Sequence, residues 1–369
     1  MDHHTLEKLQ FATIRTMLAE LCSGSLGRRL AERIQPSKSA NMVRRWLDQV
    51  RELQRVAEDI GLPPLGGIGD ITESVHAAGT PAGLDAESLS TAAAALQATG
   101  QLCDWGRELP EDAPLLTGLL GRVGDFRPIA ERIQEAVDPR GKVRDHASDK
   151  LNSIRAITAR AHARIDIVFD RLTRQTSVTR FLQYANATFH NDRKVLPLKA
   201  EHRGRINGII HRSSDSGATL FVEPTEAVEL NNTIVRLGLD AKKEIDRILR
   251  ELSRLVYINA DEIIKALETV AVLDLLVAKV RYAREHQARV ADITTDGTLD
   301  FPQARHPLLE VVLQREAGAA PDDDGDRKVV PIDIRLGDDF DLLVITGPNT
   351  GGKTVALKTL GLLTLMTQA

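Results

Sequence analysis

Cysteine is scarce in this sequence, because only Cys22 and Cys103 occur among 369 residues. A chain of this length with two cysteines is not a disulfide scaffold, and such a composition is typical of a reducing cytoplasm. No Cys-x-x-Cys pair is present, which excludes the four-ligand zinc motifs built on such pairs. The cysteine content therefore predicts a cytoplasmic protein without a disulfide framework.

Long apolar runs, aromatic residues and a strong net charge are also missing. No stretch reaches the ~20 consecutive apolar residues of a membrane-spanning helix, and no basic segment followed by an apolar run marks a signal peptide at the N-terminus. Aromatic residues make up 4% of the chain, and its formal net charge is −4. We therefore expect no membrane partner, and any nucleic-acid contact would require a local basic patch against the phosphate backbone.

Proline is absent between Pro224 and Pro302. Apolar residues recur every three or four positions over residues 151–172 and again over residues 234–277, a pattern that predicts long helices. The first of these segments is also rich in arginine on its polar face. The second is either one helix or two helices joined near Ile258.

The helical period disappears between these two segments. Residues 181–224 contain short apolar runs separated by turn-forming residues, which predicts strands and turns; the runs are Thr188–His190, Val195–Leu198, Ile209–Ile210 and Thr219–Val222. The economical arrangement is an antiparallel helical arm that carries this β insert (residues 181–224) at its far end. The alternative is a compact helical bundle with a surface hairpin.

The chain changes character again after residue 300. An acidic stretch at residues 321–326 is typical of a solvated loop, the apolar run Phe340–Thr346 predicts a buried strand, and Val355–Met366 predicts a helix. Between the last two, residues 347–354 match G-x-x-x-x-G-K-[ST] at every fixed position, in the required strand–loop–helix context.

Each residue type in this motif has a chemical role. The glycines let backbone N–H groups turn toward phosphate oxygens, the lysine reaches the β- and γ-phosphates, and the following hydroxyl binds Mg²⁺. We therefore predict an ATP-binding loop, with Thr354 as the Mg²⁺ ligand; its residues are Gly347, Pro348, Asn349, Thr350, Gly351, Gly352, Lys353 and Thr354.

These features together predict a mainly α fold with long antiparallel helices, a small β insert and the beginning of an α/β P-loop domain. The predicted parts are a helical core at 1–145, an outgoing helix at 146–180, the β insert at 181–224, returning helices at 225–299, and the nucleotide-binding part at 300–369.

Basic residues gather in the β insert. Few acids accompany them there, so they form a candidate surface for nucleic-acid phosphates; they are Arg193, Lys194, Lys199, Arg203, Arg205 and Arg212. The alternative is a solvated basic face without a partner. The spacing of His190, His202 and His211 fits no usual metal motif, and we expect these side chains to be exposed.

Several motifs resemble those of the MutS ATPases. The segment Gly347–Thr354 is similar to their P-loop, where Gly-Pro-Asn precedes Gly-Gly-Lys, and it follows the helical region as in that family. The segments Asp138–Asp145, Gly208–Pro224 and Arg305–Leu309 resemble signatures of the second bacterial MutS family. That paralogue lacks the mismatch-reading N-terminal domains. The resemblance covers essentially the whole chain.

The resemblance implies a homodimeric ATPase whose paired lever helices carry a clamp, with an ABC-type ATPase domain and often a C-terminal Smr nuclease. One implied function is binding of branched or mismatched duplex DNA to suppress recombination. A second is action on stalled or collided ribosomes through ribosomal RNA. The third possibility is a helical binding module without turnover.

The sequence departs from the family plan at its C-terminal end. It stops at Ala369, and the acids that orient the metal and water in related ATPases have no counterpart in it. We therefore expect a fragment of a longer protein, with no catalytic residue assigned. We also expect weak or undetectable ATP binding and no ATP turnover by residues 1–369.

Overall fold

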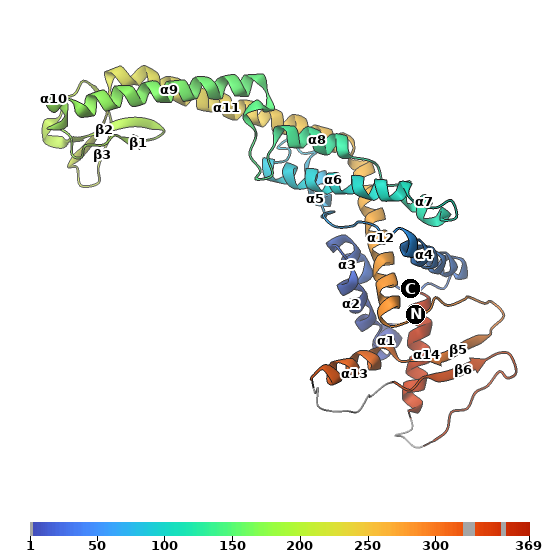
Figure 1. Ribbon diagram of the computed structural model, residues 1–369. Helices are drawn as coiled ribbons and strands as arrows, with labels where there is room; N and C mark the ends of the chain where they lie inside the picture. Colours follow the sequence, from blue (N-terminus) through green and yellow to red (C-terminus); the bar gives the residue numbers. More distant parts are fainter. Residues whose placement is uncertain (1–2, 320–328, 348–351) are drawn as a thin grey trace. The chain divides into compact units, whose positions relative to one another are not determined.

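The computed structural model describes residues 3–319, 329–347 and 352–369. The fold is mainly α with a small β-rich insert, as the sequence predicts (Figure 1). The chain forms two compact units. The first unit comprises Met1–Val75, Ala94–Ala130 and Asn259–Ala369, and the second comprises His76–Ala93 and Glu131–Ile258.

The first unit contains helices from both ends of the chain. They are α1 (His3–Lys8), α2 (Phe11–Leu21), α3 (Ser25–Ala31), α4 (Ala40–Asp59), α7 (Pro114–Leu120), α12 (Ala260–Glu285), α13 (Pro307–Ala319) and α14 (Lys353–Thr367), with strands β5 (Leu299–Ala304) and β6 (Ile332–Leu336). The two strands pair antiparallel. Helices α5 (Thr72–Ala77), α6 (Ala86–Arg107) and α8 (Arg127–Ala136) have residues in both units.

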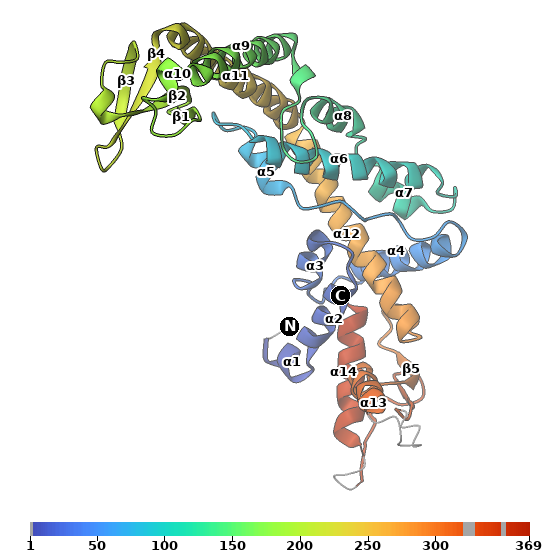
Figure 2. The ribbon, with the colours of Figure 1, turned by 60° about the vertical axis from the view of Figure 1, so that its left-hand side comes forward.

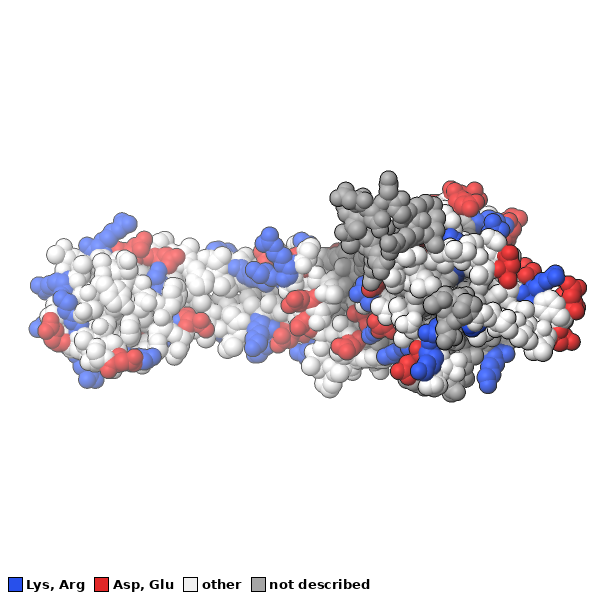
Figure 3. All heavy atoms as spheres, turned by 90° about the horizontal axis from the view of Figure 1, so that it is seen from below, with Lys and Arg blue, Asp and Glu red and all other residues white. Residues whose placement is uncertain are grey.

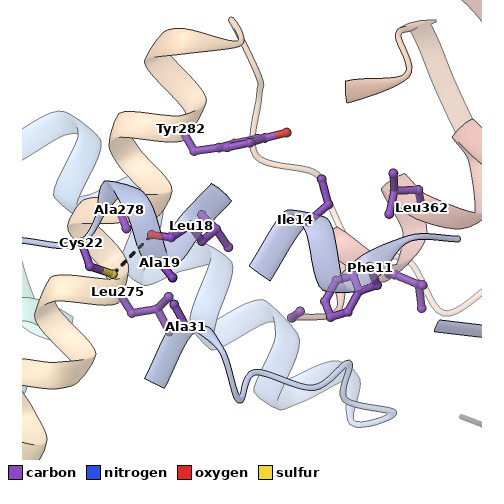
Figure 4. Packing of buried hydrophobic residues seen from close by; sticks show 12 residues of the cluster. Phe11, Ile14, Leu18, Ala19, Cys22, Ala31, Leu275, Ala278, Tyr282 and Leu362 are labelled. Carbon is purple, nitrogen blue, oxygen red and sulfur yellow. Dashed lines mark hydrogen bonds between the residues drawn. The ribbon is translucent and has the colours of Figure 1, made fainter. Parts of the chain in front are cut away.

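An apolar cluster joins four helices of the first unit (Figure 4). Helices α2, α3, α12 and α14 contribute its buried residues, among them Phe11, Ile14, Leu18, Ala31, Leu275, Ala278, Tyr282, Leu362 and Leu365. Burial of apolar side chains contributes about 25 cal/mol per Å². The cluster therefore packs α14 against α12 and against α2, which lies near the opposite end of the chain.

A buried carboxylate fastens α3 to α12. Asp274 is 2% exposed and accepts hydrogen bonds from the backbone N–H groups of Ser23 (2.7 Å) and Gly24 (2.9 Å), just before α3 begins. These N–H groups lie at the start of α3 and have no hydrogen-bond partner within the helix. Gly27 of α3 faces the same carboxylate so closely that a Cβ there would lie 2.3 Å from it.

The second unit is built on α9 (Asp149–Arg174) and α11 (Thr225–Ile258), which run side by side in Figures 1 and 2. Arg171 near the end of α9 pairs with Glu226 near the start of α11, whereas Ser148 before α9 donates to Glu244 at 2.9 Å, so the helices are antiparallel. The Ser148 hydroxyl also accepts from Leu151 N–H and caps α9. This is the pairing that the two apolar stripes predict.

The proline-free segment consists of two helices, because α11 ends at Ile258 and α12 begins at Ala260. The short elements around the arm are the 3₁₀ turns η1 (Asp145–Ala147) and η2 (Ala200–His202) and helix α10 (Thr176–Thr179). Among the described residues, no helix is both long and apolar enough to cross a membrane. The five-part division of the chain stays a prediction.

The β insert is a four-stranded antiparallel sheet in the order β1-β2-β4-β3. Its strands are β1 (Thr188–His190), β2 (Arg193–Lys199), β3 (Gly208–Ser213) and β4 (Thr219–Pro224), and each contains one of the predicted apolar runs. Leu196 of β2 belongs to one buried apolar cluster with Phe169 and Ile165 of α9 and Ile234 of α11. The sheet is thus held against both helices of the arm.

One side chain completes the β2–β4 ladder. Its register would place Lys194 opposite Pro224, which has no N–H to donate. Asn231 of α11 takes that role, because its amide nitrogen donates to Lys194 O and its amide oxygen accepts from Lys194 N–H, both at 3.0 Å. Asn231 is 1% exposed, so the helix and the sheet depend on each other.

Candidate functional site

The glycine-rich loop leads directly into α14. The structure describes Gly347, Gly352, Lys353 and Thr354 of the predicted loop, while Pro348, Asn349, Thr350 and Gly351 lie outside the described residues. Gly352 caps α14 in the left-handed region (φ 76°, ψ 6°), which strongly favours glycine. The motif glycine is therefore required by the backbone at this position.

The described groups around the loop suit a phosphate. Lys353 donates a hydrogen bond from Nζ to the carbonyl oxygen of Gly347, so its ammonium lies beside the first residue of the motif. Thr354 is exposed, and the first turn of α14 contains no acidic residue. A helix N-terminus carries unpaired N–H groups and a partial positive charge. This arrangement can bind a nucleoside triphosphate through backbone N–H groups and Lys353, and it offers the Thr354 hydroxyl to Mg²⁺.

The segment before the loop differs from the prediction. Residues 341–347 are exposed and form no strand, whereas the sequence predicts a buried strand at Phe340–Thr346. Leu342 is 77% exposed and Val344 is 70% exposed. A strand is stable only beside another strand, and no described strand pairs with this segment. The prediction of a buried strand is therefore wrong for this structure.

Two of the six basic residues proposed in the β insert are committed to ion pairs within the second unit. Lys194 pairs with Asp166 of α9 and is 15% exposed, and its ammonium lies 5.3 Å from the centre of the Phe169 ring. Arg193 donates to Glu223 at 2.8 and 3.1 Å. Their charges are thus already neutralised, which makes them poor candidates for phosphate contacts.

Glu223, which the sequence analysis did not single out, is the centre of a buried polar network. Its side chain is fully buried and accepts from Arg193, from Asn231 at 2.7 Å and from His211 at 2.6 Å. Burial alone would raise the pKa of Glu223, but hydrogen bonds from His211, Asn231 and Arg193 hold it below its usual value. His211 therefore has a structural role. The expectation of exposed side chains is wrong for all three histidines, because His190, His202 and His211 are half-buried.

The network explains part of a sequence signature. Gly208 lies opposite Pro224, and a Cβ on it would meet Glu223 O at 2.1 Å. Gly208, His211 and Glu223 all belong to the segment Gly208–Pro224 that the sequence analysis noted. The spacing alone did not show this, because the partners Arg193 and Asn231 lie outside that segment.

Three of the proposed basic residues remain available at the end of the insert. Lys199, Arg203 and Arg205 form no ion pair among the described residues, and the two arginines are exposed. Arg212 pairs with exposed Asp215, at 2.6 Å, and such surface pairs contribute little.

Arg180 joins this group, although the sequence analysis did not propose it. Its guanidinium lies 4.6 Å from the centre of the Phe181 ring. The centres of the Phe181 and His202 rings are 4.9 Å apart. Phe181 O also accepts from Lys199 N–H at 2.9 Å, which brings Arg180 close to β2. We call Arg180, Lys199, Arg203 and Arg205 the tip cluster.

The charges of the insert are mixed in the view of Figure 3, where blue and red atoms alternate over its end at the left. The cationic side chains of the insert therefore form a local cluster and not a continuous basic face in this view. Such a cluster provides a few phosphate contacts, and phosphate contacts position a protein on nucleic acid without reading its sequence.

The chain is similar along its length to curated bacterial proteins, although no family model matches it. It is 38% identical to Endonuclease MutS2 of Geobacillus sp. (strain WCH70) over 372 residues, covering 100% of this chain and 46% of that protein. It is 39% identical to Endonuclease MutS2 of Geobacillus thermodenitrificans (100% and 46%) and 38% identical to that of Shouchella clausii (98% and 44%). The chain spans about half the length of the curated relatives it matches.

Proposed function

Because the chain belongs to the MutS2 family, we propose that it forms the DNA-binding and ATP-binding part of a MutS-type DNA-processing protein. The tip cluster binds branched or mismatched duplex DNA through its phosphates. The loop at residues 347–354 binds ATP with Mg²⁺, and the intact protein, a homodimer, suppresses recombination in an ATP-dependent way. The relatives are named endonucleases, and we assign no cleaving residue to this chain.

The observation that carries the DNA-binding proposal is the tip cluster. Its four cationic side chains have no acidic partner among the described residues, while Arg193 and Lys194 are neutralised close by. Because these cations are unpaired and lie at the end of the insert, an external polyanion is the favoured partner. The support for ATP is the placement of Gly352 and Lys353 at the start of α14.

The test measures binding of a four-way DNA junction, a linear DNA duplex and an RNA hairpin of equal length by fluorescence anisotropy at 50 to 200 mM salt. The variant Arg203→Ala/Arg205→Ala should bind more weakly, with a salt slope lower by about 1.8, because each phosphate contact contributes about 0.9. Arg33→Ala/Arg45→Ala removes two exposed arginines of the first unit, neither in a described ion pair, and serves as the control.

The results separate the alternatives. Tighter binding of the junction than of the RNA hairpin supports DNA, whereas the reverse order would support a ribosomal RNA target. If the tip variant keeps the affinity and salt slope of the control, the cluster is only solvated and its proposed role in DNA binding is wrong.

A further inference from the structure

One exposed face of α9 carries a regular pattern of arginine and isoleucine. Its positions follow each other at alternating spacings of four and three residues and are all exposed; they are Ser153, Ile157, Arg160, Arg164, Ile167, Arg171 and Arg174. At 100° per residue this set is centred about 130° round the helix from the buried stripe that packs on α11. We call it the arginine face.

The arginine face is strongly cationic. No carboxylate occurs within it between Ser153 and Arg174, because Asp166 and Asp170 lie on another side of the helix. Arg171 pairs with Glu226 of α11. The remaining three arginines, Arg160, Arg164 and Arg174, form no ion pair among the described residues; Arg160 donates only from Nε, to Ala156 O at 3.3 Å.

Two isoleucines lie between these cations. Ile157 is 40% exposed and Ile167 is 68% exposed. Solvated helix faces usually alternate charges of both signs, which gives stabilising pairs three or four residues apart. Here like charges stand at Arg160 and Arg164, an arrangement that costs a few tenths of a kcal/mol in an isolated helix. The face is therefore not arranged for the stability of α9 itself.

The dimensions of the face fit a polyanion. Arg160 and Arg174 are about 21 Å apart along the helix axis, at about 1.5 Å per residue. A DNA duplex presents a charge about every 1.7 Å of its axis, so several phosphates fall within that length.

The face also ends beside the insert. Phe169 and Leu172, in the last turns of α9, pack against Leu182 and Leu196 of the β insert, and Arg174 is followed six residues later by Arg180 of the tip cluster. Both surfaces belong to the second unit. A duplex bound at the tip cluster therefore lies next to the arginine face.

We propose that the arginine face is a second nucleic-acid surface, which binds the phosphate backbone of a duplex beside the tip cluster. The proposal rests on the nucleic-acid binding proposed above and adds residues outside the insert to it. Phosphate contact is the chemistry expected, because the face offers guanidinium groups and no aromatic ring.

The experiment uses the full 369-residue chain with Arg160→Gln/Arg164→Gln/Arg174→Gln. Glutamine keeps the helix propensity and removes three charges. The control Arg33→Gln/Arg45→Gln/Arg122→Gln removes the same charge from exposed arginines of the first unit that form no described ion pair. Circular dichroism should show unchanged thermal unfolding for both, since exposed substitutions usually have small effects.

Anisotropy titrations with a 30-base-pair duplex between 50 and 200 mM salt give the result. Three lost contacts lower the salt slope by about 2.7. The fourfold rise in salt should therefore reduce the duplex affinity of the wild type by a factor about 40-fold larger than that of the variant. The control should retain the wild-type slope. Equal slopes for the variant and the control would overturn the proposal and would point to an acidic protein surface as the occupant of this face.

The two proposals fail in different ways. If Arg203→Ala/Arg205→Ala weakens binding and the arginine-face variant does not, only the further inference is wrong. If the wild type binds no duplex at 50 mM salt, both are wrong. If only the arginine-face variant weakens binding, the face stands and the tip cluster loses its role.

Discussion

A substitution at Arg193 distinguishes a structural role from a nucleic-acid-binding role. The sequence analysis predicts that Arg193 contacts phosphate, whereas in the structure its guanidinium pairs with Glu223. The change Arg193→Met keeps an aliphatic side chain and removes the guanidinium. Breaking a buried ion pair costs about 3–5 kcal/mol. Arg193 is 23% exposed, and Glu223 keeps His211 and Asn231 as partners. We therefore expect a smaller loss, about 2–3 kcal/mol of stability in the β insert.

Hydrogen exchange of the β2 and β4 amides measures that loss locally. A loss of 2–3 kcal/mol corresponds to exchange roughly 30- to 160-fold faster, at 1.36 kcal/mol per factor of ten. The matched control Arg203→Met changes an exposed arginine of the same insert and should leave exchange unchanged. Nucleic-acid binding at matched folded concentration should keep its salt slope in Arg193→Met.

The pH dependence gives a second readout. The pKa of Glu223 is held below its ordinary value of about 4.5, so the stability it contributes is present above that pH and is lost as the pH falls through the lower folded-state pKa. The difference in the stability of the β insert between the wild type and Arg193→Met should therefore become smaller below about pH 4.5. Wild-type exchange rates in Arg193→Met, together with a salt slope lower by about 0.9, would refute this reasoning and restore Arg193 as a phosphate contact.

Hydrogen bonds from Arg247 above all lower the pKa of Glu244 to about 2; Glu244→Gln should therefore lower the unfolding temperature at pH 7, with the difference disappearing as the pH falls from about 4.5 toward 2. Gly27→Ala should cost about 1–3 kcal/mol in urea denaturation, because its Cβ would clash with a carboxylate of α12. Gly118→Ala, in a helix with no atom within 4 Å of the added Cβ, should instead be neutral or stabilising by up to about 1 kcal/mol. Lys353→Ala should remove any ATP binding detected by equilibrium dialysis, and Lys353-dependent ATP hydrolysis by the 369-residue chain would contradict the expectation of no turnover.

Local patterns in the sequence were sufficient for most secondary structure. The apolar stripe at residues 151–172 stops two residues inside each end of α9, and the run Thr188–His190 coincides with β1. The motif glycine at residue 352 adopts the left-handed backbone conformation that its type permits. These features follow from interactions between residues only a few positions apart, which a single sequence contains in full.

Pairing over long distances in the chain was decided only by the tertiary structure. Six basic residues of the insert look equivalent in sequence, yet Lys194 meets Asp166, 28 residues away, and Arg193 meets Glu223, 30 residues away, while Arg203 has no acidic partner in the described part of the chain. The apolar run before the glycine-rich loop has the composition of a buried strand, but it lies exposed beside no described strand. The residue type determines which groups a side chain can bind. Which of them becomes its partner is decided only by the packing of distant segments.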